Sequence, residues 1–142
     1  MQTVLVPFDG SPSAKRAIQY LVDFSREYPQ IKVHVLNVQP GPKLYGNYVS
    51  ATMLEQLNAG AEDHAKEIVA EAASQLEAAG IACVTHTAVG EITSELVEAV
   101  ARHGCDTVVM GTRGMGSLGN LVMGSVATRV VHDSPVPVLL VK

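Results

Sequence analysis

The sequence predicts a single-domain α/β protein over residues 1–142, with a five-stranded parallel sheet and helices on both of its faces. Five short apolar runs alternate with four helical patterns from end to end, and such alternation is typical of parallel sheets. Hydrophobic residues make up 47% of the chain, which fits a globular protein. No linker, repeat or low-complexity tract divides it. One domain is therefore the simplest organisation.

The first strand is expected at residues 3–8, an apolar run that ends at the turn Asp9-Gly-Ser-Pro12. Ser11 is a suitable helix N-cap because its hydroxyl can accept a hydrogen bond from the first turn. Proline is favoured at the first helical position, where Pro12 stands. The helix then shows apolar residues at a period close to 3.6 until Pro29 closes it. Residues 31–38 are apolar enough for a second buried strand.

A loop is expected over residues 39–50, which contain two prolines and two glycines. A long helix follows over about residues 51–79, and its many alanines allow close packing against a sheet. Gly80 ends this helix, because glycine adopts the left-handed conformation that commonly terminates helices. Residues 81–89 are predicted to form the third strand.

The last third of the chain repeats the same alternation. A helix is expected over residues 90–103, with Gly104 as its end, and a fourth strand over residues 105–110. After a glycine-rich segment, residues 121–132 are predicted to form a short helix. Two prolines break the chain, and residues 138–141 form the last strand.

Composition excludes several classes of function. The formal net charge is −4, and no basic block provides the positive surface that nucleic-acid binding needs. Residues 1–8 are too short for a signal peptide and lack a basic start. No apolar stretch approaches the roughly 20 residues that cross a bilayer. We expect a cytoplasmic protein with no nucleic-acid partner and no membrane insertion.

The cysteines, histidines and paired glutamates are interpreted as structural. Cys83 and Cys105 lie in apolar runs without metal-ligand spacing, so they are expected to be reduced core thiols. Glu91 and Glu95, one turn apart on the predicted helix, are interpreted as a solvated face rather than an acid/base pair. No pair of histidines has metal-ligand spacing, and structural or surface roles are expected for His34, His64, His86, His103 and His132.

The glycine-rich segment Gly111-Thr-Arg-Gly114-Met-Gly116-Ser-Leu-Gly119-Asn-Leu-Val-Met-Gly124-Ser125 carries most of the chemical information. It leaves a buried strand and leads into a helix. Glycines let backbone N–H groups approach an anion, and a helix N-terminus adds partial positive charge. The segment therefore predicts a phosphate-binding loop. The alternative is a mobile connection with no ligand.

Two standard nucleotide motifs match this segment only in part. Gly114-x-Gly116-x-x-Gly119 has the dinucleotide spacing, but that fingerprint belongs after the first strand of a fold, and here only one helix and one strand remain. Gly119-x-x-x-x-Gly124-Ser125 has the spacing of a P-loop without its lysine. Neither motif is assigned.

The chain resembles the universal stress protein family, in its ATP-binding branch. The run from Val4 to Ser11 is similar to the family's start, and the run from Ser134 to Val141 to its end. The family's loop pattern is Gly-x-x-Gly, nine residues, then Gly-Ser or Gly-Thr, and it is matched without a gap by Gly111, Gly114, Gly124 and Ser125. The resemblance covers the whole chain, so residues 1–142 are identified as one universal stress protein domain.

The resemblance implies a strand order of 3-2-1-4-5 and a fold like that of the adenine nucleotide alpha-hydrolases. Asp9 would then face the adenosine and Val38 would line the adenine pocket, while the glycines and Ser125 would hold the ribose and phosphates. From the residues alone, Asp9 is equally a turn former, Ser125 a helix cap, and Arg113 a solvated loop cation. The nucleotide-binding residues that the resemblance implies are Pro7, Asp9, Val38, Met110, Gly111, Arg113, Gly114, Gly124 and Ser125.

The implied function is a dimeric, ATP-binding stress-response or regulatory module. Many relatives carry a basic residue where Gly119 or Asn120 stands, so ADP or AMP is expected to bind comparably. Asp9 is the candidate to hold Mg²⁺ or Mn²⁺ with the nucleotide, and no catalytic residue is assigned. The family's last strand commonly pairs between subunits, which here implies pairing through Val138, Leu139, Leu140 and Val141.

Other functions stay open at this stage. A slow ATPase or phosphotransferase would need a metal clamp and a group that orients the attacking water. A dimeric interaction protein that binds no nucleotide would need only the last strand, as the edge through which two subunits pair. A flavin carrier is the weakest alternative, because the chain has four Tyr, two Phe and no Trp to stack on a flavin.

Overall fold

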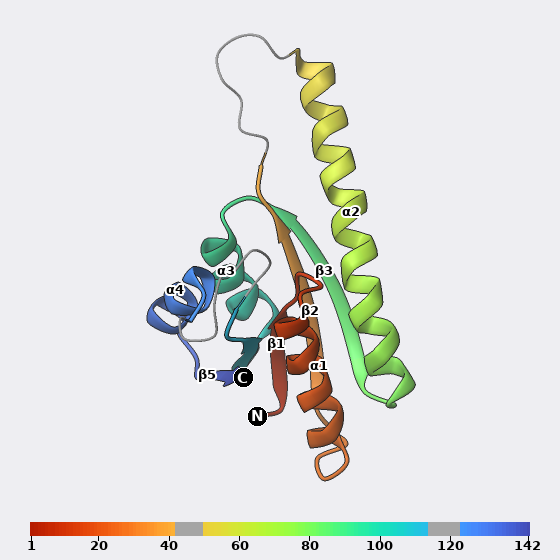
Figure 1. Ribbon diagram of the computed structural model, residues 1–142, viewed down its shortest axis with the longest axis vertical. Coiled ribbons are helices and arrows are strands. Elements are labelled where there is room, and N and C mark those ends of the chain that lie inside the picture. The colour runs from red at the N-terminus through yellow and green to blue at the C-terminus, as the bar shows by residue number, and fades with distance from the viewer. Residues whose placement is uncertain (42–49, 114–122) are drawn as a thin grey trace.

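The structure, a computed structural model, describes residues 1–41, 50–113 and 123–142 (Figure 1). Its helices and strands follow the predicted alternation. They are β1 (Thr3–Pro7), α1 (Pro12–Ser25), β2 (Lys32–Gln39), α2 (Ala51–Ala78), β3 (Ala82–Val89), α3 (Ile92–His103), β4 (Thr107–Gly111), α4 (Ser125–Asp133) and β5 (Val138–Val141).

The strands of the described residues form one sheet in the order β3-β2-β1-β4-β5, and every adjacent pair is parallel. This confirms the predicted fold class and strand order. β1 and β4 are neighbours although a long stretch of chain separates them, and the order of winding reverses between them. In open α/β sheets, ligands bind outside the carboxyl ends of the strands at such a reversal.

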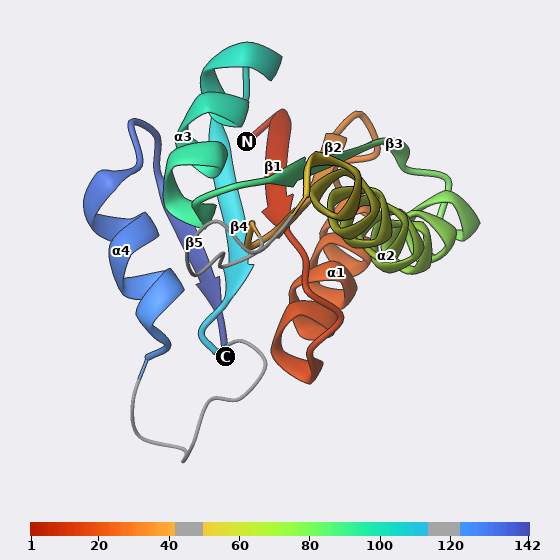
Figure 2. The ribbon, with the colours of Figure 1, turned by 90° about the horizontal axis from the view of Figure 1, so that it is seen from above.

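Alternate strand residues supply two separate cores on the two faces of the sheet. Figure 2 shows α1 and α2 on one face and α3 and α4 on the other. Val4 and Val6 of β1 pack in the core under α1 and α2. Leu5 packs in the core under α3 and α4. This two-sided burial explains why the strands appear in the sequence as continuous apolar runs.

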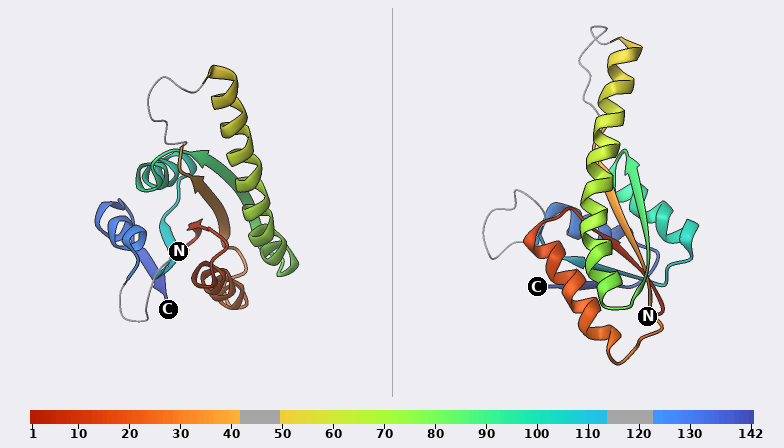
Figure 3. Two further views of the ribbon diagram at one scale, coloured as in Figure 1. Left: turned by 45° about the horizontal axis from the view of Figure 1, so that its top comes forward. Right: turned by 90° about the vertical axis from the view of Figure 1, so that its right-hand side faces the viewer.

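The long helix α2 packs against the sheet through its second half only. Its buried residues begin at Ala65 and end at Leu76. Its first half extends beyond the sheet (Figure 3). Within the described part of the chain, no helix is both long enough and apolar enough to cross a membrane.

Several predicted boundaries differ from the structure. α1 ends at Ser25, before the predicted stop at Pro29. β4 continues through Gly111, which pairs with Val141 instead of starting the loop. α4 begins at Ser125 rather than at residue 121, because Gly124 has an extended backbone (φ −59°, ψ 154°). Residues 121 and 122 lie outside the described part.

Candidate functional site

A cavity lies at the carboxyl ends of β1, β2 and β4, where the order of winding reverses. The N-terminal turns of α3 and α4 complete its wall. Of the residues predicted from the sequence, the cavity is lined by Pro7, Asp9, Val38, Met110, Gly111, Arg113, Gly124 and Ser125. Gly114 lies outside the described residues. The lining also includes residues that the sequence did not single out: Phe8, Ala14, Leu36, Asn37, Ile92, Val126 and Ala127.

Asp9 lies in the tight turn between β1 and α1. Its carboxylate Oδ1 accepts a hydrogen bond from the Ser11 backbone N–H at 2.9 Å. Gly10 has a φ of +78°, a conformation that glycine adopts without a steric penalty. Ser11 then caps α1, its Oγ accepting from the Ala14 N–H at 3.1 Å. Asp9 therefore forms the turn, which is one of the two roles considered for it from the sequence. It also lines the cavity.

Asn37 is a cavity residue that the sequence analysis missed. Only 3% of it is exposed. Its Nδ2 donates to the Phe8 carbonyl oxygen at 2.8 Å, and its Oδ1 accepts from Gln39 Nε2 at 2.7 Å. Buried amides are normally hydrogen-bonded, so Asn37 ties the end of β2 to the turn that carries Asp9. The available signal was an amide residue between the apolar residues Leu36 and Val38.

Gly111 is held against the first turn of α1. A Cβ at this position would meet Ser13, with the backbone carbonyl carbon and oxygen of Ser13 only 2.6 Å away. Two residues further on, the Arg113 backbone N–H donates to Ser13 Oγ at 3.2 Å. Glycine is therefore needed here for packing between β4 and α1, whatever the cavity holds.

Three helix N-termini border the cavity, and they are capped differently. Ser11 caps α1 and Glu91 caps α3 with side-chain hydrogen bonds. α4 begins after Gly124 and receives no side-chain cap hydrogen bond from the described residues. Its first turn, Ser125 to Ala127, lines the cavity. The first N–H groups of a helix have no partner within the helix, so α4 offers N–H donors and partial positive charge to this space.

Glu91 is exposed, as expected, and it is also the N-cap of α3, a role that the sequence analysis did not assign. Its carboxylate accepts from the Ser94 N–H at 2.7 Å and from the Thr93 N–H at 3.2 Å. Hydrogen bonds from Ser94, then the Thr93 N–H and the nearby Arg129, lower the pKa of Glu91 to about 2. Arg129 Nη2 lies 3.5 Å from Glu91 Oε1, so the cap also links α4 to α3.

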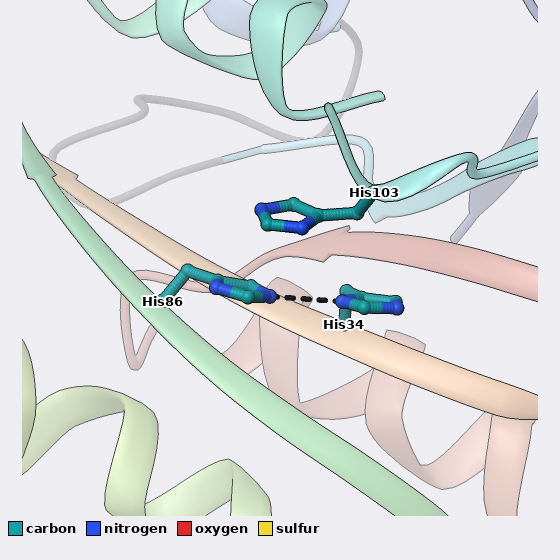
Figure 4. A group of neighbouring side chains, drawn as sticks. All are labelled: His34, His86 and His103. Carbon is teal, nitrogen blue, oxygen red and sulfur yellow. Dashed lines mark hydrogen bonds between the residues drawn. The ribbon is translucent and has the colours of Figure 1, made fainter. Parts of the chain in front are cut away.

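The five histidines are spread along the sequence, but three of them meet in the fold. Figure 4 shows that His34, His86 and His103 lie together, although they come from β2, β3 and the end of α3. Their ring nitrogens can be chosen so that all three lie within 4.8 Å of one another. His64 and His132 are exposed, as expected. Sequence spacing could not reveal the group, because each histidine belongs to a different element.

The two cysteines are free, as predicted. Cys105 is buried and Cys83 partly so. Burial, with a smaller effect of Glu77, raises the pKa of the Cys83 thiol to about 11. Burial also raises the pKa of Cys105. Both side chains thus have the properties of packing residues rather than of nucleophiles.

Known proteins match the chain over its full length. The model of the universal stress protein family matches residues 1–142. A universal stress protein of Thermus aquaticus is 29% identical over 142 residues, covering 99% of this chain and 98% of the relative. A universal stress protein of Methanocaldococcus jannaschii is 27% identical over 143 residues, covering 98% of this chain and 81% of the relative.

Solved structures have the same architecture. Universal stress protein UspA from Lactobacillus plantarum superposes with a TM-score of 0.83 at 22% identity, covering 99% of this chain and 97% of that one. A universal stress protein in complex with cAMP gives 0.69 at 26% identity, covering 99% and 97%. An Arabidopsis thaliana family protein with AMP bound gives 0.73 at 20% identity, covering 100% and 92%. The first and third of these likenesses concern the fold alone.

Proposed function

The chain belongs to the universal stress protein family, and from that premise we propose that it binds an adenine nucleotide in the cavity at the carboxyl ends of β1, β2 and β4. A structural relative at 26% identity was solved in complex with cAMP, a ligand of this chemical class. The cavity lies at the winding reversal where α/β sheets bind ligands.

The observation that carries the proposal is the uncapped N-terminus of α4. In α1 and α3, a side-chain oxygen already accepts from the first N–H groups. The first N–H groups of α4 receive no such bond from any residue in 1–41, 50–113 or 123–142. The N–H groups near Ser125 and Val126 can therefore donate to a phosphate oxygen, and the helix dipole favours the negative charge. We assign the phosphates to this end of the cavity, with Gly111 at the end of β4 and Gly114 and Gly124 in the connection that follows.

The adenosine would occupy the opposite end of the cavity. Val38 and Met110 offer apolar surface on which a purine can pack. Asp9 offers carboxylate oxygens, which only accept hydrogen bonds when ionised and so suit the two hydroxyls of a ribose. Pro7 and Arg113 also line the cavity.

The proposal includes ATP, ADP and AMP. The sequence lacks the P-loop lysine that contacts the terminal phosphates, so it gives no reason to expect a preference for the triphosphate. If Mg²⁺ or Mn²⁺ accompanies the nucleotide, Asp9 is the residue of this cavity that would approach it, because hard divalent cations prefer oxygen ligands.

Mass spectrometry of ligand released from the purified chain, followed by calorimetric titration with ATP, ADP and AMP, tests the proposal. Asp9→Asn keeps the Oδ1 acceptor of the turn and removes the charge, so we expect folded protein with roughly tenfold weaker binding, about 1.4 kcal/mol. Asp63→Asn, on an exposed part of α2, is the matched control and should bind as the wild type does. Failure of all three nucleotides to bind the wild-type chain would refute the proposal.

We further propose that two copies pair through β5. Within the described residues β5 pairs with β4 on one side only, and its Val138–Val141 backbone leaves the other edge of the sheet open. Open edges present unpaired N–H and C=O groups that readily pair with another strand. Such a dimer would continue the sheet across two subunits.

A further inference from the structure

We infer that His34, His86 and His103 form a binding site for a divalent transition-metal ion of the zinc class. Each residue offers one ring nitrogen, and these three nitrogens all lie within 4.8 Å of one another. None of the three residues lines the proposed nucleotide cavity. The inference is therefore independent of the proposed function, and either can fail without the other.

The fold itself brings the three imidazoles together. His34 shares a face of β2 with Leu36, which packs in the core under α3 and α4. His86 pairs in register with Leu36 on the neighbouring strand β3, so its side chain lies on that same face. His103 is the last residue of α3, the helix that covers this face. Three different elements thus direct one imidazole each to one place (Figure 4).

The rings are already in contact without a metal. His34 Nδ1 lies 2.8 Å from His86 Nε2, a hydrogen bond in which one nitrogen donates and the other accepts. The ring centroids of His86 and His103 are 3.9 Å apart, and those of His34 and His103 are 5.0 Å apart. An ion that binds here would replace the His34–His86 hydrogen bond, since each ligand nitrogen must present its lone pair to the metal.

His34 is the buried member of the group, with only 5% of it exposed. Its Nδ1 faces His86, whereas its Nε2 lies on the other side of the ring and has no hydrogen-bond partner among the described residues (Figure 4). Burial, then the neighbouring His103, lowers the pKa of both His34 and His86. Neutral imidazole, whose lone pair is free, is the form that coordinates a metal.

The donor set selects the class of ion. Imidazole nitrogen suits Zn²⁺, Cu²⁺ and Ni²⁺, whereas Mg²⁺ and Ca²⁺ prefer oxygen. Zn–N bonds of about 2.0–2.1 Å at tetrahedral angles separate ligand nitrogens by about 3.3 Å. The three nitrogens now lie within 4.8 Å of one another. For Zn²⁺ to bind, rotation of the half-buried His86 and His103 side chains would have to bring their nitrogens to about 3.3 Å from each other and from that of His34, which stays fixed in the core.

Charges around the cluster act in both directions. The C-terminal end of α3 carries partial negative charge beside His103, which favours a cation. Lys32 acts on His34 and Arg102 on His86 as opposing positive charges. Both of these are solvent-exposed side chains, so salt screens their repulsion more effectively than it weakens direct metal–nitrogen bonds. Three histidines leave a fourth position for water, as in open zinc sites.

Calorimetric titration of the metal-free full-length chain with Zn²⁺, without nucleotide, tests the site. We expect one Zn²⁺ per chain and at least tenfold weaker binding in His103→Ala, a change at a half-buried helix end. His132→Ala is the matched control, because His132 is exposed and bonded to Asp133. It should bind Zn²⁺ as the wild type does. Equal affinity in wild type and His103→Ala would overturn the inference.

Imidazole NMR of the ¹⁵N-labelled wild-type chain gives a second readout that depends on no variant. On addition of one equivalent of Zn²⁺, we expect shifts in the rings of His34, His86 and His103, with His64 and His132 unchanged. Shifts confined to His64 or His132, or no stoichiometric binding, would show adventitious surface binding and overturn the site even if His103→Ala proved unstable.

Discussion

Gly111 is required by packing, and it is also one of the residues of the proposed nucleotide site. It belongs to a family nucleotide-binding pattern, yet its missing side chain is also required by Ser13 of α1, whose backbone lies 2.6 Å from where a Cβ would be. Backbone atoms cannot move aside as a flexible side chain can. The identity of this residue is therefore explained by packing before any ligand is considered.

We expect Gly111→Ala to lower the free energy of unfolding by about 1–3 kcal/mol, because overpacking forces β4 and α1 apart. Gly60→Ala is the control. Gly60 lies on an exposed part of α2 with no atom within 4 Å of an added Cβ, so alanine there should stabilise by up to about 1 kcal/mol. Urea unfolding of both variants measures the difference, and equal stability of Gly111→Ala and wild type would contradict this packing account.

Cys83 provides a test of the protonation states inside the fold. Its pKa of about 11 means that only on the order of a thousandth of the thiol is ionised at pH 8. Since the thiolate is the reactive form, iodoacetamide should alkylate the native chain far more slowly than the chain unfolded in guanidinium chloride. Intact mass measured over time follows the reaction. Rapid labelling of Cys83 in the native state would contradict its assigned environment.

Among the helices, the cap at the N-terminus decides whether the first N–H groups are already hydrogen-bonded or can bind a ligand. The Ser11-Pro12 pair correctly predicted where α1 begins. Glu91 was interpreted as part of a solvated face, and its role as the cap of α3 became visible only from the hydrogen bonds that it accepts from Ser94 and Thr93. α4 begins at Ser125, later than the expected residue 121.

The cap of α3 makes a prediction about pH. The pKa of Glu91 is about 2 in the folded chain, below its ordinary value of 4.5, so the fold favours the ionised form. The resulting stabilisation is complete above pH 4.5 and is lost as the pH falls toward 2. Glu91→Gln keeps an acceptor but no charge, so it should be less stable than the wild type at pH 7, and this gap should close on acidification.

Urea midpoints measured between pH 7 and pH 2.5 check the capping prediction. Glu67→Gln, on an exposed part of α2, controls for the general effect of removing one negative charge from a chain of net charge −4. If the difference in urea midpoint between wild type and Glu91→Gln stayed constant with pH, this would argue against an ionised cap.

At the scale of the whole molecule, the open edge at β5 leads to a prediction of assembly. If β5 pairs between subunits, analytical ultracentrifugation should give twice the chain mass of 15.0 kDa. Leu140→Pro would remove a backbone donor from this strand and should shift the equilibrium toward monomer, because proline cannot take part fully in strand pairing. Circular dichroism should accompany the measurement to confirm that the variant folds. A wild-type monomer at high concentration would exclude the β5 dimer.

The sequence by itself determined the class and order of the elements, because apolar periodicity, helix caps and glycine stops are local signals. The resemblance to the family further predicted the strand order. It also predicted nine site residues, and the eight of them that the structure describes line one cavity. Asn37, which supports the turn of Asp9, was hidden because its partner Phe8 lies after β1, far from β2 along the chain.

Only the tertiary structure decided which residues meet across the sheet. Parallel pairing sets His86 beside Leu36 and so near His34, and the end of α3 adds His103 to them. Gly111 meets Ser13 in the same way, through packing between elements far apart along the chain. Such neighbours depend on strand register and helix placement, which are fixed by burial of the whole core and leave no spacing rule in the sequence.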